Sequence, residues 1–449
     1  MPGINLTKIC KTVMNFFYET VNKEDETVKF VKRKSKINAT LFVEILIAGC
    51  LSDATISLER MCKLAKQRGI KVTKQGLQQR FSPEATALMH NLFQKSLEQY
   101  RTENHAVIDL LKPFSLVQLL DSSGISLPST LKELFKGCGG SGSESGLKLQ
   151  VLFDYLKGQV KEVTITEGCK NDLSFDDHLN HIEENGLYLQ DLGYFKLDTF
   201  AAIQAKNAYF ISRYLNQTKI FNEMNEPINL LQELRKAGPS FIKDVLIDRR
   251  KKKLAVRLIA NRLPDAAVEE RIRKLKRNAQ KDGRIPKDTT LELAHWSIYI
   301  TNVPKQMLNN EQVHLVYSLR WQIELFFKLC KGEAGIDKVN GKNSDRILCE
   351  IYAKLICVVM SLYFCFPLRW KENLEISFQK SYRMIKLRAA EFFCALKSRY
   401  RLLKLLNELF SDLIDFAFKD KARKKRRLTH QKLMDSTNQK ILAGDACLA

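Results

Sequence analysis

The sequence has 449 residues, 45% of them hydrophobic, and its 73 Lys and Arg outnumber its 50 Asp and Glu to give a net charge of +23. This hydrophobic content is that of a globular protein, and a chain of this length is too long for one core, so about three or four modules are expected. The excess of positive charge predicts a polyanionic partner, either nucleic acid or an anionic membrane surface.

No segment is predicted to span a bilayer or to direct export. The best apolar candidate, residues 355–366, is short and is predicted to form a buried helix. The amino terminus has no charged and then apolar leader, so we expect a protein that stays inside the cell. The eleven cysteines include no C-x-x-C pair and no cysteine–histidine zinc spacing. Reduced, structural thiols are therefore expected.

Residues 1–105 are predicted to form a helical DNA-binding domain. A helix over 57–69 is followed by Thr73, which can cap a polar helix over 74–80. Two helices joined by a short turn resemble a helix-turn-helix, and the basic chain favours DNA as the ligand. The alternative is a plain helical bundle, because Gly76 weakens the second helix as a recognition helix.

Residues 106–215 have the pattern of strands separated by turns and helices. The dipeptide Lys157-Gly158 is predicted to be the turn of a hairpin. A helical stretch is expected near 172–184 and another helix over 199–206. The five predicted strands cover residues 115–120, 147–155, 159–166, 186–190 and 208–214.

Two aspartates stand at the ends of predicted strands. Asp121 follows the first strand and precedes Ser-Ser-Gly, and Asp191 follows the fourth strand and precedes Leu-Gly. An aspartate at the carboxyl end of a central strand can point into a cleft. The alternative for Asp121 is an Asx turn. The rival of Asp191 is Asp198, which is better placed to cap the next helix.

Residues 216–302 contain strand-like runs at 243–247, 253–259 and 293–302 and a charged helix over 264–282. From 248 to 287 there are fifteen Lys or Arg and five Asp or Glu. A charge run is ordinarily a solvated surface, but this density in a chain that is basic throughout favours contacts with phosphate. The candidate DNA-binding cations of the hairpin tip are Arg249, Arg250, Lys251, Lys252 and Lys253.

Tyr317, Arg320, Glu324 and Lys331 have the spacing Y-x2-R-x3-E-x6-K. At about 100° per residue, these positions fall within a stripe roughly 60° wide on one α-helix, above an apolar face. A carboxylate beside fixed cations suits a site that holds a metal ion and phosphate oxygens together. The alternative is an ordinary amphipathic helix with i,i+4 charge pairs.

This spacing resembles the YREK signature of the insertion-sequence-four family of bacterial DDE transposases, which cut and paste DNA with a ribonuclease-H-like catalytic core. All four positions match without a gap. The resemblance implies that Glu324 is the third metal-binding carboxylate. It also implies that Tyr317, Arg320 and Lys331 hold the DNA backbone at the transposon end.

The resemblance requires two more carboxylates, and Asp121 and Asp191 match them as catalytic metal ligands. Three carboxylates suit two Mg²⁺ ions, for which Mn²⁺ is a possible substitute. The expected fold is α/β, with a ribonuclease-H-like catalytic core interrupted by a β-rich insertion and with helical N- and C-terminal domains. Its expected parts are the core over 106–215 and 303–370 and the insertion over 216–302.

In relatives a tryptophan of the insertion stacks on a base flipped out of the DNA end, and Trp296 is the candidate here. The alternative is a core tryptophan. By resemblance, the partners are double-stranded DNA at the transposon ends and at the target, with a homodimer on paired ends. A membrane partner is not expected. The expected location is the bacterial cytoplasm, in association with the nucleoid.

The carboxyl-terminal residues 371–449 are predicted to be helical and, by resemblance, to make subunit contacts. They include the basic run 419–427, which has seven Lys or Arg in nine residues. Two alternatives to an active transposase remain: a non-catalytic DNA-binding protein derived from one, and a stand-alone metal-dependent nuclease. The complete Asp121, Asp191 and Glu324 set favours the transposase.

Overall fold

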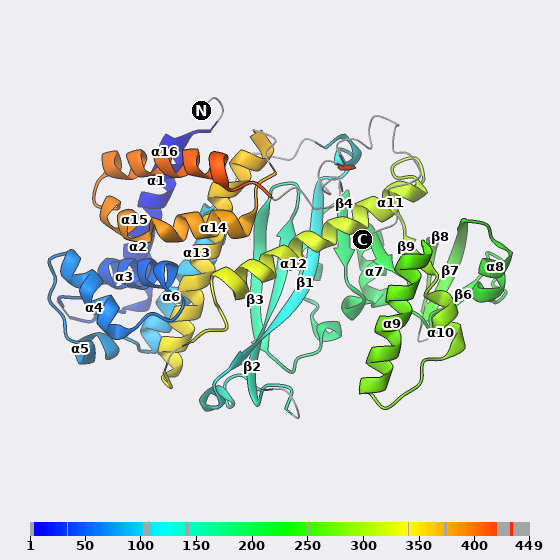
Figure 1. Cartoon of the computed structure of the whole chain (residues 1–449), viewed down its shortest axis with the longest axis horizontal. Helices are drawn as coiled ribbons and strands as arrows, with labels where there is room; N and C mark the ends of the chain where they lie inside the picture. The colour runs from blue at the N-terminus through cyan, green and yellow to red at the C-terminus, as the bar shows by residue number, and fades with distance from the viewer. Residues whose placement is uncertain are drawn as a thin grey trace. The chain divides into compact units, whose positions relative to one another are not determined.

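The computed structural model describes residues 4–33, 35–101, 108–139, 143–249, 252–339, 341–371, 375–419 and 432–433. The chain divides into two compact units (Figure 1). The helical unit comprises Met1–Ala106, Ser122–Lys170 and Gln322–Lys425. The sheet unit comprises Val107–Asp121, Asn171–Trp321 and Arg426–Ala449.

Four helices near the start of the helical unit begin at polar capping residues. Asn38, Ser57, Thr73 and Ser82 each accept a hydrogen bond from a backbone N–H of the following first turn, which satisfies a donor that the helix leaves unpaired. The α-helices of this unit are α1 (Leu6–Asn15), α2 (Val21–Val28), α3 (Ala39–Ser52), α4 (Leu58–Gln67), α5 (Lys74–Gln78), α6 (Pro83–Gln99), α12 (Trp321–Lys328, from its second residue), α13 (Ser344–Lys371), α14 (Phe378–Leu387), α15 (Ala389–Ala395) and α16 (Arg399–Phe416).

The helix predicted over 74–80 is shorter in the structure, because α5 ends at Gln78. Its Lys74 ammonium forms an ion pair of 3.1 Å with Glu59. The Arg80 guanidinium donates a hydrogen bond of 3.2 Å to the carbonyl of Ile37. Two of the cations expected on a recognition helix therefore contact their own unit, and DNA binding by this region stays a prediction.

Helix α13 forms the centre of the helical unit and is longer than the apolar segment predicted at 355–366. Among the described residues, Ser344–Arg369 is the one helix that is long and apolar enough to cross a membrane, so the expectation that no segment reaches this length is wrong. The most apolar stretch of this helix is fully buried in the structure. Its charges have partners inside the unit: Arg346 bonds Glu350 at 2.8 Å.

Three strands also belong to the helical unit, in the order β3-β2-β1. Strands β2 (Ser145–Asp154) and β3 (Gln159–Glu167) form the predicted antiparallel hairpin. Its turn requires glycine, since Gly158 has a φ of +63° and an added Cβ would clash with the ring of Phe366. Strand β1 (Leu116–Leu127) enters this unit with its second half.

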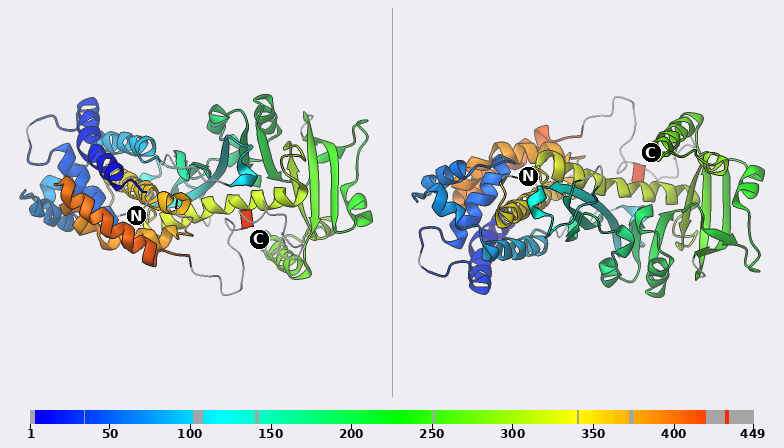
Figure 2. Two further views of the ribbon diagram at one scale, coloured as in Figure 1. Left: turned by 90° about the horizontal axis from the view of Figure 1, so that it is seen from above. Right: turned by 90° about the horizontal axis from the view of Figure 1, so that it is seen from below.

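The sheet unit contains the first half of β1 in the strand order β1-β4-β5-β9-β8-β7-β6 (Figure 2, strands β5 to β9 in green). Strands β1, β4 and β5 are parallel, and the neighbours beyond β5 are antiparallel. The strands are β4 (Gly186–Gln190), β5 (Tyr209–Arg213), β6 (Lys219–Phe221), β7 (Ser240–Arg249), β8 (Lys252–Arg262) and β9 (Trp296–Thr301), with helices α7 (Leu197–Ala205), α8 (Leu230–Lys236), α9 (Asp265–Lys281), α10 (Asp288–Leu293) and α11 (Asn310–Tyr317).

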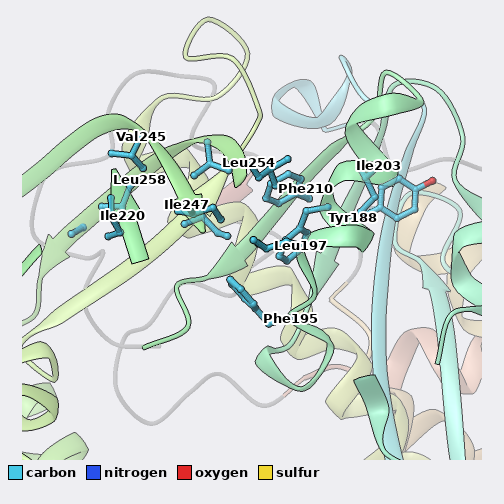
Figure 3. Close-up of a cluster of buried hydrophobic side chains, with 14 of the residues drawn as sticks. Tyr188, Phe195, Leu197, Ile203, Phe210, Ile220, Val245, Ile247, Leu254 and Leu258 are labelled. Atoms are coloured by element: carbon cyan, nitrogen blue, oxygen red, sulfur yellow. The ribbon is translucent and has the colours of Figure 1, made fainter. Parts of the chain in front are cut away.

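The segment 216–302, where a β-rich insertion is expected, shares a hydrophobic core with the preceding strands. Ile203 and Phe210 belong to the same buried cluster as Ile247 and Leu258 (Figure 3). Strand β9 also pairs directly with β5. The segment therefore extends the parallel sheet by four strands within this unit.

Two local predictions are wrong. The strand expected to end before Asp121 continues to Leu127, although its buried run stops at Leu120. The helix expected near 172–184 is replaced by two short 3-10 turns, Asp172–Ser174 and Asp177–His181. Both segments contain closely spaced Ser, Asp or Asn, which compete for backbone hydrogen bonds and blur the sequence pattern.

Candidate active site

Asp121 and Asp191 occupy equivalent positions on two neighbouring parallel strands. In the β1–β4 pair, Leu120 lies opposite Gln190; Asp121 is the next residue of β1, and Asp191 is the residue that directly follows β4. Side chains alternate between the faces of a strand, so residues at the same offset from a paired position lie on the same face. The Asp121 side chain is 17% exposed and that of Asp191 is 42% exposed.

The Arg320 guanidinium faces both aspartates. Its Nη1 donates a hydrogen bond of 2.9 Å to Oδ2 of Asp121. Its Nε lies 3.9 Å from Oδ1 of Asp191. The Arg320 side chain is 16% exposed, so this cation offsets the repulsion of two carboxylates in a partly desolvated place. Three of the predicted site residues are thus together in the sheet unit.

Tyr317 holds the backbone just before Asp191. Its hydroxyl donates a hydrogen bond of 3.2 Å to the carbonyl of Gln190. The side chain is buried, and burial raises the pKa of the Tyr317 phenol well above its ordinary value, so the hydroxyl keeps its proton. The rings of Tyr299 and Tyr317 have centroids 5.1 Å apart, and the Arg213 guanidinium lies 5.7 Å from the Tyr317 ring. The structure therefore places Tyr317 in the interior, and its contact with the DNA backbone stays a prediction.

The signature residues follow one another along consecutive helical segments instead of one regular α-helix. Asn309 begins α11 with a capping box that involves Gln312. The segments are α11, the 3-10 turn Ser318–Arg320, α12 (Trp321–Lys328) and the π-turn Leu329–Glu333. The apolar underside is present as predicted, with Ile323, Phe326, Phe327 and Cys330 buried.

Glu324 lies on α12, one helical turn after Arg320, and Lys331 lies in the π-turn. Both side chains are partly exposed, and both residues belong to the helical unit. Their participation in the site stays a prediction. Within the described part of the chain, no three or more His, Cys, Asp or Glu side chains are grouped so as to hold a metal ion.

A comparison with protein families decides the family of the chain. Residues 112–360 match the family described as "Transposase DDE domain". The matched range is more than half of the chain, and it contains Asp121, Asp191 and Glu324. The chain belongs to the DDE transposases.

Curated relatives span nearly the whole of this transposase. It is 28% identical over 425 residues to the transposase for insertion sequence element IS231F of Bacillus thuringiensis subsp. israelensis, with 88% of this chain and 87% of the relative covered. It is 27% identical over 442 residues to the transposase for insertion sequence element IS1151 of Clostridium perfringens, with 92% and 93% covered. These relatives and the family match confirm the insertion-sequence-four group that the YREK spacing predicts.

Among solved structures, the transposase resembles the cryo-EM structure of the piggyBac transposase synaptic complex with hairpin DNA. The TM-score is 0.47 at 10% sequence identity, and the alignment covers 90% of this chain and 84% of that one.

The described cations at the tip of the β7–β8 hairpin contact groups of the sheet unit. Lys252 forms an ion pair with Asp198, and Lys253 donates a hydrogen bond to Asn225. The Arg249 guanidinium lies 5.9 Å from the ring of Phe195. Arg250 and Lys251 lie outside the described residues. Three of the predicted DNA-binding cations of the transposase therefore already have partners within the protein.

Asp198, the rival of Asp191, lies in the first turn of α7. The helix begins at Leu197, so Asp198 is not its capping residue. An acidic group in a first turn is favoured by the helix dipole. Its ion pair with Lys252 gives Asp198 a structural role, whereas Asp191 is the aspartate that lies beside Arg320.

Trp296 is a core residue of the transposase. The residue is 7% exposed and belongs to the buried cluster of the sheet unit. Its carbonyl accepts a hydrogen bond of 2.7 Å from Nη1 of Arg271. A base cannot stack on a ring enclosed in this way, so the structure supports the core alternative over the predicted base-stacking role.

Proposed function

We propose that this DNA transposase moves an insertion sequence by cut-and-paste transposition, with strand cleavage at the terminal inverted repeats and strand transfer into target DNA. The observation that carries the proposal is the position of Asp121 in β1 and of Asp191 directly after the neighbouring parallel strand β4, both beside Arg320. The YREK spacing, which continues to Glu324 and Lys331, supports it. The ribonuclease-H-like core is part of this proposal, and the parallel pairing of β1 with β4 and of β4 with β5 supports it.

The reaction is proposed to depend on Mg²⁺, with Mn²⁺ as a possible substitute. Asp121 and Asp191 fit such ions, because their carboxylates are hard oxygen donors that lie together around the Arg320 guanidinium. Glu324 would be the third ligand. The chemistry supplied by bound ions is stabilisation of negative charge on the attacking and leaving oxygens of an in-line phosphoryl transfer.

The protein's own residues have separable tasks in this scheme. The Tyr317 hydroxyl fixes the Gln190 carbonyl and with it the position of Asp191. The Arg320 guanidinium can exchange its bond to Asp121 for charge-assisted bonds to a DNA phosphate, because a planar guanidinium matches phosphate oxygens in pairs. Lys331 is proposed to contact the backbone of the cut end.

The proposed partners are double-stranded DNA at the transposon ends and at the target. A reaction that joins two ends of one element to a target requires both ends in one complex, so we propose a homodimer on paired ends. The proposed location is the bacterial cytoplasm, in association with the nucleoid. The net charge of +23 suits a protein that works on a polyanion.

A cleavage assay on the element's own end tests the function. The purified protein is incubated with a duplex that carries the terminal inverted repeat, with Mg²⁺ or with a chelator, and with a scrambled duplex as a control. The proposal predicts cleavage at the repeat boundary with Mg²⁺ and joining of the released end to a target plasmid. Equal cleavage of the scrambled duplex without joining would point to a stand-alone nuclease, and binding without cleavage to a non-catalytic protein.

A further inference from the structure

Helix α9 is attached to the sheet unit by one side. Val268 is its buried residue, and the Arg271 side chain, half-buried beside it, donates a hydrogen bond of 2.7 Å to the carbonyl of Trp296. Leu275 and Ala279, farther along the same side, are partly buried. At about 100° per residue, these four positions lie within one side of the helix. The attachment holds the helix in place and leaves its opposite side to solvent.

The opposite side carries a row of exposed cations. Five lie on the helix and two more follow in the segment after Gly283, and between residues 273 and 287 the one acidic residue is Asp282. The five on the helix fall within about 160°, centred roughly opposite Val268. These seven residues, called the α9 arm below, are Arg273, Lys274, Lys276, Arg277, Lys281, Arg284 and Lys287.

The α9 arm differs from the hairpin tip in how its charges are used. Lys252 and Lys253 of the tip contact groups of the sheet unit. In the arm, Lys274 pairs with Glu270 at 2.8 Å, and the other six form no ion pair with any described residue. Acidic residues at the start of a helix and basic ones at its end are also favoured by the helix dipole. That effect acts within the last turn and does not account for the cations from Arg273 to Arg277.

We propose that the α9 arm binds the phosphate backbone of duplex DNA, independently of base sequence. The inference rests on the proposed function, in which DNA is the substrate, and adds the surface that holds it. Duplex DNA carries one negative charge per about 1.7 Å of its axis. Along one strand the phosphates lie about 3.4 Å apart, and Arg273 and Lys281 are separated by about 12 Å along the helix axis, so the helical part of the arm spans about three or four phosphates.

The test measures DNA affinity against salt concentration for two variants with the same reduction in charge. In the arm variant, Arg273, Lys276, Arg277 and Lys281 are changed to Gln. In the control variant, four exposed cations elsewhere on the sheet unit are changed to Gln: Lys206, Lys219, Lys236 and Lys305. Binding is followed by fluorescence anisotropy with an end-containing duplex and with an unrelated duplex.

The expected result is a flatter salt dependence for the arm variant, by about 0.9 in the slope of log affinity against log salt for each phosphate that the variant no longer neutralises. Both duplexes should be affected equally, and the control variant should keep the wild-type slope. A further variant, with Arg273 and Arg277 changed to Lys, keeps the charge and should keep the slope, which separates charge from helix folding.

An unchanged slope in the arm variant, or an equal change in the control variant, would overturn the proposal. The result is distinguishable from failure of the proposed function. If the arm variant has the flatter salt slope but the wild-type protein never cleaves its own end, the DNA-binding role of the α9 arm stands and the proposed transposition reaction is wrong. If the wild-type protein cleaves its own end but the arm variant keeps the wild-type salt slope, the proposed function stands and only the DNA-binding role of the α9 arm is wrong.

Discussion

Arg320 donates a hydrogen bond of 2.9 Å to Asp121 in the structure, and this bond joins the YREK signature to the first strand of the sheet. The two residues are 199 positions apart in the sequence. The same guanidinium lies 3.9 Å from Asp191, so one cation compensates two carboxylates on neighbouring strands. The structure thus has a positive charge next to the oxygens that are proposed as metal ligands.

Replacement of Arg320 by Ala should increase the extent to which Mg²⁺ raises the melting temperature of the protein. Without the guanidinium, two carboxylates repel each other, and we expect a decrease of about 1 kcal/mol in the free energy of unfolding. Added Mg²⁺ should then stabilise the variant more than the wild type, because a cation that binds only the folded state raises stability. Thermal unfolding with and without Mg²⁺ measures this.

The same variant should also engage the cut DNA end more weakly and impair strand transfer. Arg320→Lys is the matched control, since it keeps the charge and removes the paired geometry of the guanidinium. An identical Mg²⁺-induced shift in the melting temperature of wild type and Arg320→Ala would contradict the idea that Arg320 compensates the two aspartates.

Replacement of Tyr317 by Phe removes the hydroxyl that bonds the Gln190 carbonyl. We expect a decrease of about 1 kcal/mol in stability and a fall in the cleavage rate of roughly tenfold or more, because Asp191 is less well held. Affinity for the transposon end should stay at the wild-type value, since the phenol is buried. Titration with labelled DNA measures the affinity, and single-turnover cleavage measures the rate. A large drop in affinity would contradict this prediction and would support the direct contact between Tyr317 and DNA that the resemblance implies.

The local patterns in the sequence were sufficient to predict most strands and the apolar side of the signature helix. Runs such as 186–190 and residues such as Ile323 and Phe326 are buried as their spacing predicts. Lys157-Gly158 forms the predicted turn because a positive φ at Gly158 is a local requirement. Such features depend on neighbours in the chain, and a pattern of a few residues is enough to identify them.

Features that depend on distant partners could not be predicted from the sequence. The pairing of Lys252 with Asp198, the bond from Tyr317 to Gln190 and the burial of Trp296 all join elements far apart in the chain. The composition shows that both the hairpin tip and the α9 arm are rich in Lys and Arg. Only the tertiary contacts show that cations of the hairpin tip bind groups of the sheet unit, whereas most of those in the α9 arm do not. Gln190 contributes through its backbone carbonyl, for which no side-chain pattern exists.

His178 should make the protein less stable in weak acid. Burial lowers the pKa of His178 to about 4, below the ordinary value of about 6.5. Between these two values the unfolded chain binds a proton that the folded chain does not, so stability rises with pH up to about 6.5 and falls below it. From pH 7 to pH 5, this group should cost about 2 kcal/mol.

The variant His178→Phe isolates that contribution, because the ring of His178 stacks on that of Phe175, with centroids 5.7 Å apart. Urea unfolding at pH 5 and pH 7 measures the difference for each protein. The variant should lose less stability in acid than the wild type, and an equal decrease in both would assign the acid sensitivity to other groups.

The most direct test of the proposed active site is Mg²⁺-dependent cleavage at the element's own end by variants that each lack one of the three carboxylates. Asp121→Ala, Asp191→Ala and Glu324→Ala should each reduce cleavage to background while DNA binding is largely kept, because each removes a proposed metal ligand instead of a phosphate contact. Asp198→Ala is the matched control, since Asp198 is the nearby aspartate that pairs with Lys252, and it should still cleave. Full cleavage by folded Asp121→Ala or Asp191→Ala, or absence of cleavage in Asp198→Ala with Asp191→Ala active, would contradict the assignment of this site.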